Sequence, residues 1–161
     1  MRTVRKVLFT FTILLSLFVQ RSVLSEPLYT LKVESLDTGK ILFHCSLQAG
    51  DRFFIDYIHS SDKTPVQDIF EISGEGILVL IEERFSWFGA GLEHLSWEKA
   101  SVVYEKDCTR VLLRREFPSL RLRVGRVAQH RLTVHGTVIF LRDIGRGGEL
   151  LKIWAEPIDP S

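Results

Sequence analysis

Short runs of alternating apolar and polar residues, broken by turn-forming residues, most constrain the fold of this 161-residue chain. Successive side chains of a strand point to opposite faces of a sheet, so a period of two residues is typical of strands with one buried face. Turns such as Asp37-Thr38-Gly39 and Ala49-Gly50-Asp51 separate the runs. The pattern predicts strands at 31–33, 41–47, 53–57, 66–72, 102–104, 111–113, 120–124, 132–134, 138–141 and 150–154, and a continuous apolar run predicts one more at 77–81.

About 9 to 11 short strands at this spacing predict an all-β fold, either a single-domain antiparallel β-sandwich or a small β-barrel. A hydrophobic content of 45% and an aromatic content of 11% are sufficient to fill one core in a chain of this length. Beyond the N-terminal segment, 92–99 is the one place where a short helical turn is expected.

The N-terminal segment has the organisation of a secretory signal. Three cations among the first six residues precede an apolar run at 7–19, which is shorter than the roughly 20 residues that cross a bilayer. Val23 and Ser25 are small enough to precede a cleavage site. We therefore predict a signal peptide at 1–25, with an uncleaved anchor as the alternative.

Both alternatives place a single β domain at 26–161 outside the cytoplasm, in the periplasm or another extracytoplasmic space. Removing the four bases of 1–25 leaves 17 bases against 20 acids, a net charge of −3. Such a domain lacks the basic field that nucleic-acid binding requires, and membrane contact is expected through the signal or a partner alone. The remaining arginines fit the solvated face of strands better than an anion or headgroup patch: Arg110, Arg114, Arg115, Arg121, Arg123 and Arg126.

Two cysteines, Cys45 and Cys108, follow the predicted signal. An even number in an oxidising compartment favours one disulfide between them. Cys45 also alternates with apolar residues on a predicted core face, where a free buried thiol is common. No metal site and no cofactor is predicted, because neither these thiols nor the five histidines have the spacing of a metal-binding motif.

The segment 57–66 combines a strand end with a histidine, hydroxyls, charges and a proline. Alternation places Tyr57 and His59 on one face and Ser60 on the other. Pro65 biases Thr64 toward extended geometry, so 60–64 is expected to connect a hairpin. That hairpin would bring Asp68 or Phe70 back beside Tyr57 and His59, and His59 would find a partner in Tyr57 or in an acid of the next strand.

The residue types of a serine hydrolase are present in this corner, but adjacent strand residues face apart, so His59 cannot readily activate Ser60. A G-x-S-x-G elbow is also missing from the sequence. The alternative enzyme would use His59 with a loop hydroxyl, from Ser61 or Thr64, and Asp68.

A second candidate region is the aromatic and glycine-rich segment 85–92. Gly89 and Gly91 would let the backbone expose N–H groups toward an anion, and Trp87 would supply an apolar wall. The alternative is a turn beside core aromatics.

These motifs together resemble the prokaryotic domain of unknown function numbered 1850. The resemblance rests on Tyr57-x-His59-Ser60, Lys63-Thr64-Pro65-Val66 with Asp68, Phe85-Ser86, Gly89-Ala90-Gly91-Leu92, Val124-Gly125, and Leu132 before Gly136. This chain departs from the family pattern at Ser61, where a small apolar residue is usual, and at Asp68, where a glutamate is usual.

The resemblance implies an exported accessory or binding module without catalysis, associated with a TRAP-type (TAXI) solute transporter through its permease or solute receptor. A small organic anion is a further expected partner. The expected ligand- or partner-binding residues are Tyr57, His59, Ser60, Lys63, Thr64, Asp68, Trp87, Gly89 and Gly91.

Overall fold

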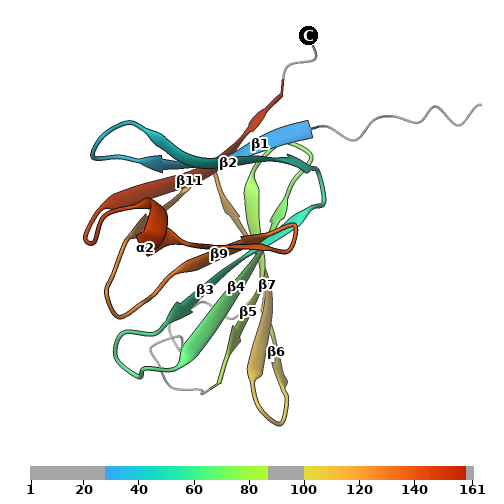
Figure 1. Ribbon diagram of the computed structural model, residues 1–161. Helices are drawn as coiled ribbons and strands as arrows, with labels where there is room; N and C mark the ends of the chain where they lie inside the picture. The colour runs from blue at the N-terminus through green and yellow to red at the C-terminus, as the bar shows by residue number, and fades with distance from the viewer. Residues whose placement is uncertain (1–27, 87–99, 159–161) are drawn as a thin grey trace, which may run out of the picture.

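Two antiparallel sheets face each other in the computed structural model, which describes residues 28–86 and 100–158 (Figure 1). The smaller sheet has the order β2-β1-β11-β8 and the larger has the order β10-β9-β3-β4-β5-β7-β6. The strands of the smaller sheet are β1 (Leu28–Ser35), β2 (Ile41–Gln48), β8 (Leu120–Arg123) and β11 (Leu150–Pro157). Those of the larger sheet are β3 (Arg52–Ile58), β4 (Pro65–Ile72), β5 (Leu78–Phe85), β6 (Ser101–Tyr104), β7 (Thr109–Phe117), β9 (Arg131–Val134) and β10 (Thr137–Phe140).

This arrangement is a β-sandwich, which confirms the predicted all-β class and decides between its two forms. Over the described residues each sheet keeps two edge strands, β2 and β8 in one and β10 and β6 in the other, so neither closes into a barrel. Each of the eleven predicted runs overlaps a strand, although several bounds differ.

A single turn of helix, α2 (Leu141–Ile144), follows β10 and was not predicted. The apolar run 138–141 predicts a strand through Leu141, but the strand ends at Phe140, and Leu141 is fully buried as the first residue of the helical turn. The predicted helical turn at 92–99 and the predicted signal at 1–25 lie outside the described residues.

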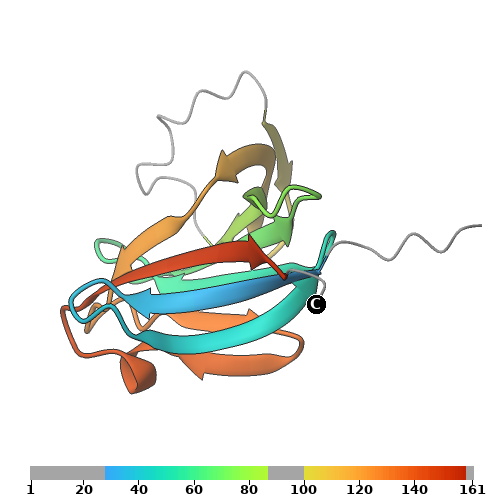
Figure 2. The ribbon, with the colours of Figure 1, turned by 90° about the horizontal axis from the view of Figure 1, so that it is seen from above.

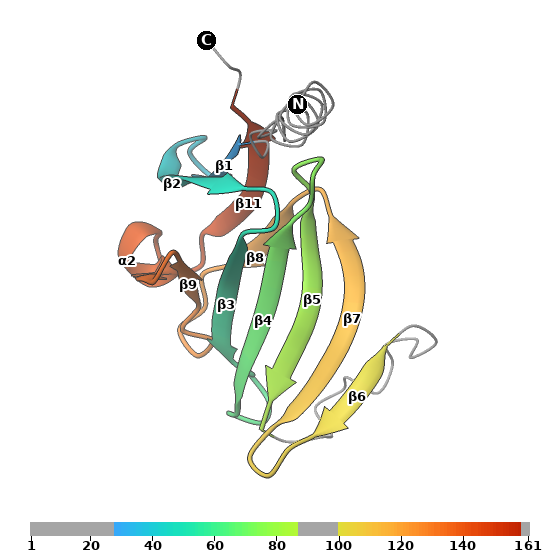
Figure 3. The same cartoon turned by 90° about the vertical axis from the view of Figure 1, so that its right-hand side faces the viewer.

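The main core lies between the two sheets, and the smaller sheet covers one end of the larger (Figures 2 and 3). Leu31 and Val33 of β1 and Ile153 of β11 are fully buried against Phe53 of β3, whose ring stacks on Phe70 at 5.1 Å. The other ends of β3, β4, β5 and β7 extend beyond this cover (Figure 3). A second, smaller apolar cluster of Val66, Phe85 and Val111 lies there.

The predicted disulfide is wrong, because both cysteines are free. Cys45 lies in the middle of β2 and packs against the main core, whereas Cys108 lies in the turn between β6 and β7 at the far end of the other sheet (Figure 1). An even cysteine count cannot show that two thiols belong to opposite ends of the fold. The alternative of a free thiol on a core face describes Cys45.

Candidate functional site

The turn between β3 and β4 is built around His59. Its backbone N–H donates to Thr64 O at 2.9 Å, and its carbonyl accepts from the Lys63 N–H at 3.0 Å, which closes the predicted hairpin. Lys63 has a positive φ of 58°, and its Nζ donates to the carbonyl oxygen of Ser60. The Thr64-Pro65 step leads into β4 as expected.

The partners of His59 are local. The Nδ1 atom lies 3.0 Å from Ser61 Oγ and 3.0 Å from Asp62 Oδ2, so both contacts use the same ring nitrogen. A hydrolase relay places the hydroxyl and the acid on different nitrogens of the imidazole. Ser61, His59 and Asp62 therefore have the residue types of a hydrolase relay, but the hydroxyl and the acid do not lie on opposite nitrogens of the imidazole.

The hairpin register differs from the prediction. Tyr57 opposes Val66, and Asp68 opposes Ile55, so neither Asp68 nor Phe70 returns directly beside Tyr57 and His59. The turn holds six residues between the strands, which places Val66 rather than Asp68 or Phe70 opposite Tyr57. Asp68 is instead a diagonal neighbour of Tyr57 on the inner face.

Asp68 meets a second carboxyl on that inner face, because it directly opposes Glu83 of β5. Asp68 Oδ1 and Glu83 Oε2 are both buried and have no hydrogen-bond partner among the described residues. Burial, then the charge of Glu83, then that of Asp56 raise the pKa of Asp68 to about 7. Burial also raises the pKa of Glu83, against the opposing charge of Arg115.

Two polar rings, those of Tyr57 and His130, pack beside each other, with 5.7 Å between their centroids. Burial, followed by the charges of Asp68 and Glu83, raises the pKa of Tyr57, and burial lowers the pKa of His130. All of these shifts disfavour the charged form, so this end of the inner face favours neutral side chains.

The outer face of the same strands carries a line of polar residues that we call the cross-strand row. Asp56 of β3 opposes Arg131 of β9 on one side and Gln67 of β4 on the other. Arg84 of β5 opposes Gln67 and also Arg110 of β7. Facing strands are about 5 Å apart, so the register alone brings these five side chains together.

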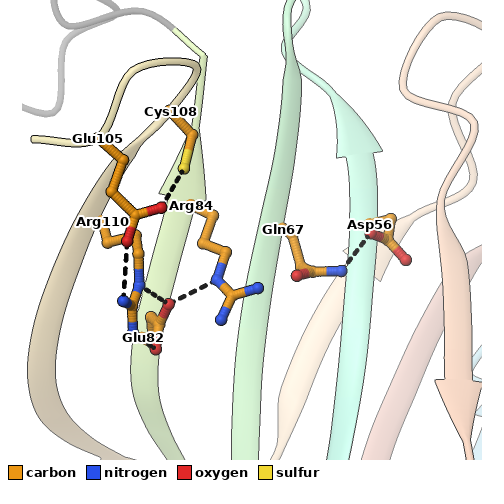
Figure 4. A network of polar contacts seen from close by, with 7 residues as sticks. All are labelled: Asp56, Gln67, Glu82, Arg84, Glu105, Cys108 and Arg110. Carbon is orange, nitrogen blue, oxygen red and sulfur yellow. Dashed lines mark hydrogen bonds and ion pairs between the residues drawn. The ribbon is translucent and has the colours of Figure 1, made fainter.

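Ion pairs and hydrogen bonds hold the row in place (Figure 4). Gln67 Nε2 donates to Asp56 Oδ1 at 2.8 Å, and Arg131 Nη2 lies 3.9 Å from the same oxygen. Glu82 Oε1 accepts from Arg84 Nε at 2.5 Å and from Arg110 Nε at 2.6 Å. The shared acid allows the two adjacent arginines to lie side by side.

The two arginines stabilise the charged form of Glu82. Hydrogen bonding from Arg110 first, and then from Arg84, lowers its pKa to about 2, although partial burial acts in the other direction.

Four residues of the row, all except Arg110, line a pocket of about 350 Å³ at the ends of β3, β4 and β5. Arginine, amide and carboxyl groups line it together with aromatic and aliphatic side chains. Its lining residues are Asp56, Tyr57, Ile58, Pro65, Val66, Gln67, Arg84, Phe85, Ser86, Cys108, Gln129, Arg131 and Phe140.

The predicted site residues fall into four groups. Tyr57 lines the pocket. His59, Ser60, Lys63 and Thr64 form the neighbouring turn, while Asp68 lies on the inner face. The remaining predicted residues, Trp87, Gly89 and Gly91, lie outside the described residues.

A family model described as "Domain of unknown function (DUF1850)" matches residues 53–141, more than half of the chain. The chain belongs to this family. The resemblance predicted from the sequence is confirmed, and the DUF1850 match contains every residue that lines the pocket. Comparisons with curated proteins and with solved structures found no match.

Two other findings bear on this DUF1850 domain. The described residues contain no group of three or more His, Cys, Asp or Glu side chains arranged to hold a metal ion. In the same part of the chain, no helix has the length and apolar character needed to cross a membrane.

Sequence reasoning missed the row itself. Asp56, Gln67, Arg84 and Arg131 come from four strands and form no motif along the chain. The sequence does indicate that each of these residues lies on the outer face of its strand, because side chains alternate between the two faces. Placing them in one row required the order of the strands and the register shift between β4 and β5.

Proposed function

We propose that this DUF1850 domain is an exported accessory or binding module, without catalysis, that binds a small organic anion in the pocket. Its partner would be a TRAP-type (TAXI) solute transporter, through the permease or the solute receptor. The observation that carries the proposal is the pocket with Arg84 and Arg131 in its lining.

The geometry suits recognition of an oxyanion. A guanidinium presents fixed, charged donors to a carboxylate, and such hydrogen bonds are stronger than neutral ones. Both arginines lie on paired strands. Arg84 is oriented by the hydrogen bond that its Nε donates to Glu82. The volume of about 350 Å³ falls at the small end of ligand sites in proteins.

The pocket is tested by ligand-induced stabilisation of the purified full-length protein. A panel of small organic anions should contain at least one that raises the melting temperature, since a ligand that binds the folded state stabilises it. Arg84→Lys should weaken that shift at least threefold, because lysine keeps the charge but loses the planar fork.

Arg121→Gln is the matched control, since Arg121 is an exposed arginine on β8 of the other sheet. Its response to the ligand should equal that of the unchanged protein. If no anion in the panel shifts the melting temperature, or if both variants lose the shift equally, the pocket is not the anion site.

The transporter partnership is supported by the family resemblance and needs its own experiment. The tagged protein is expressed together with a TAXI-type TRAP permease and its solute receptor, and membranes are extracted in mild detergent. We expect a permease or solute receptor to co-purify in near-stoichiometric amount. If neither is recovered with the bait although both are present in the extract, the accessory role fails.

The hydrolase alternative is favoured by one observation, the 3.0 Å approach of Ser61 Oγ to His59 Nδ1. It predicts that Ser61→Ala and His59→Ala each abolish hydrolysis of activated esters and leave the melting temperature unchanged. Equal hydrolysis by both variants and the unchanged protein would exclude it.

A further inference from the structure

The orientation of the Gln67 amide is fixed by its neighbour. An ionised carboxylate accepts hydrogen bonds and donates none, so the 2.8 Å contact with Asp56 Oδ1 requires the NH₂ group of Gln67 on that side. The amide oxygen is therefore on the opposite side, toward β5, as Figure 4 shows. Asp56 turns Gln67 into a hydrogen-bond acceptor that faces Arg84.

Arg84 presents the complementary group. Its Nε donates to Glu82, and its two Nη atoms lie away from that contact, one of them on the side of Gln67 (Figure 4). Over the described residues, Gln67 and Arg84 are not hydrogen-bonded to each other. The pocket thus contains an acceptor and a set of charged donors side by side, on residues that face each other across β4 and β5.

The pocket also contains apolar groups. Ile58 and Pro65, a facing pair at the ends of β3 and β4, line it together with Phe140 at the end of β10. A ligand that satisfies the polar pair can therefore bury a hydrocarbon chain against these side chains.

We propose that the ligand of this pocket is a free α-amino acid with an apolar side chain. Its carboxylate accepts from Arg84, its ammonium donates to Gln67 Oε1, and its side chain lies against Ile58, Pro65 and Phe140. This inference rests on the proposed function and sharpens it from an organic anion to a zwitterion. Asp56 is the positioning residue, because it holds the amide of Gln67 in the required orientation.

The same geometry predicts discrimination. A carboxylic acid without the amino group satisfies Arg84 but leaves the acceptor of Gln67 without a donor, and a site built for a hydrogen bond rejects a ligand that lacks it. A second carboxylate on the ligand would meet the charge of Asp56.

Titration calorimetry on the full-length protein tests this with three probes of matched shape. They are leucine, 4-methylpentanoate, which lacks the amino group, and 3-methylbutylamine, which lacks the carboxylate. We expect leucine to bind at least tenfold more tightly than either analogue. Arg84→Lys should weaken leucine and 4-methylpentanoate by a similar factor, and Arg121→Gln should change neither.

Asp56→Asn separates positioning from a structural role. The amide of asparagine can accept or donate, so Gln67 is released to turn its NH₂ group toward the ligand. The preference for leucine over 4-methylpentanoate should then fall at least fivefold, with 4-methylpentanoate binding as well as before. A loss of affinity for both probes in equal measure would remove Asp56 from the positioning role.

Equal binding of leucine and 4-methylpentanoate to the unchanged protein would overturn the inference and leave the organic-anion proposal standing. If none of the three probes binds, the amino-acid inference also fails. The organic-anion panel with its Arg84→Lys variant then decides separately whether the proposed function stands.

Discussion

Neighbouring residues on β4 and β5 meet opposite environments on the two faces of one sheet. On the outer face, Gln67 and Arg84 belong to a row in which hydrogen bonds and opposite charges stabilise the charged groups. On the inner face, Asp68 and Glu83 oppose each other with a buried oxygen apiece that no described residue contacts. The identity of a carboxyl group therefore says little about its charge state; the face on which it lies decides that.

The largest expected effect is a pH dependence of stability that comes from Asp68 on the inner face. The pKa of Asp68 is raised to about 7 in the folded protein, so between about pH 4 and pH 7 the folded state holds a proton that the unfolded state has lost. The contribution of Asp68 to stability is therefore greatest at low pH and is lost as the pH rises through about 7.

Asp68→Asn removes this ionisation. The free energy of unfolding of the variant relative to the unchanged protein should increase by about 2 to 3 kcal/mol from pH 5 to pH 8. Urea unfolding at the two pH values measures it. Asp37→Asn, in an exposed turn, is the control and should show no such trend. A constant difference between the two pH values would mean that Asp68 is ionised at pH 5.

The outer face should respond with the opposite sign. Glu82 has a pKa lowered to about 2, so its contribution is complete above the unfolded value and is lost as the pH falls through about 2. Glu82→Gln leaves Arg84 and Arg110 without their shared acid and should destabilise the protein by about 1 to 2 kcal/mol at pH 7, after allowance for solvent screening.

Urea unfolding of Glu82→Gln at pH 7 and pH 3 checks the sign. The destabilisation should be smaller at pH 3, where the unfolded state gains a proton that folded Glu82 mostly lacks. If Glu82→Gln and Asp68→Asn change stability in the same direction at pH 8, the contrast between the faces is wrong.

A smaller effect is expected in the turn beside the row. His59 is in contact with Ser61 and Asp62, which belong to the same six-residue turn. His59→Ala should change the free energy of unfolding by less than about 1 kcal/mol, because its ion pair with Asp62 is local to the turn and partly open to solvent. A loss of several degrees in melting temperature would show that the turn is structural.

The smallest effect concerns the thiols. Cys45 on β2 and Cys108 in the turn between β6 and β7 are both free, so a reducing agent has no bond to cleave. The melting temperature with and without reductant should agree within error. A lower melting temperature in the presence of reductant would show that a disulfide is present after all.

Much of the fold could be predicted because strand alternation is local. The placement of Phe53 and Ile55 on one face and Asp56 on the other follows from sequence alone, and so do ten of the predicted strands; the continuous apolar run at 77–81 predicted the other. The turn before β4 could also be predicted, because the effect of Pro65 on Thr64 depends only on neighbouring residues. The partner of Asp68 could not be predicted in this way, since the length of that turn sets the register and places Asp68 opposite Ile55.

The sequence by itself determined the strands, the all-β class and the family, because periodicity and motifs need no knowledge of long-range contacts. Tertiary structure alone decided that Arg131, Asp56, Gln67 and Arg84 form one row, and that Asp68 meets Glu83. Those groupings depend on strand order and register, which bring together residues as far apart as 56 and 131. The distance between side chains within a sheet is set by pairing, and pairing is a property of the folded chain.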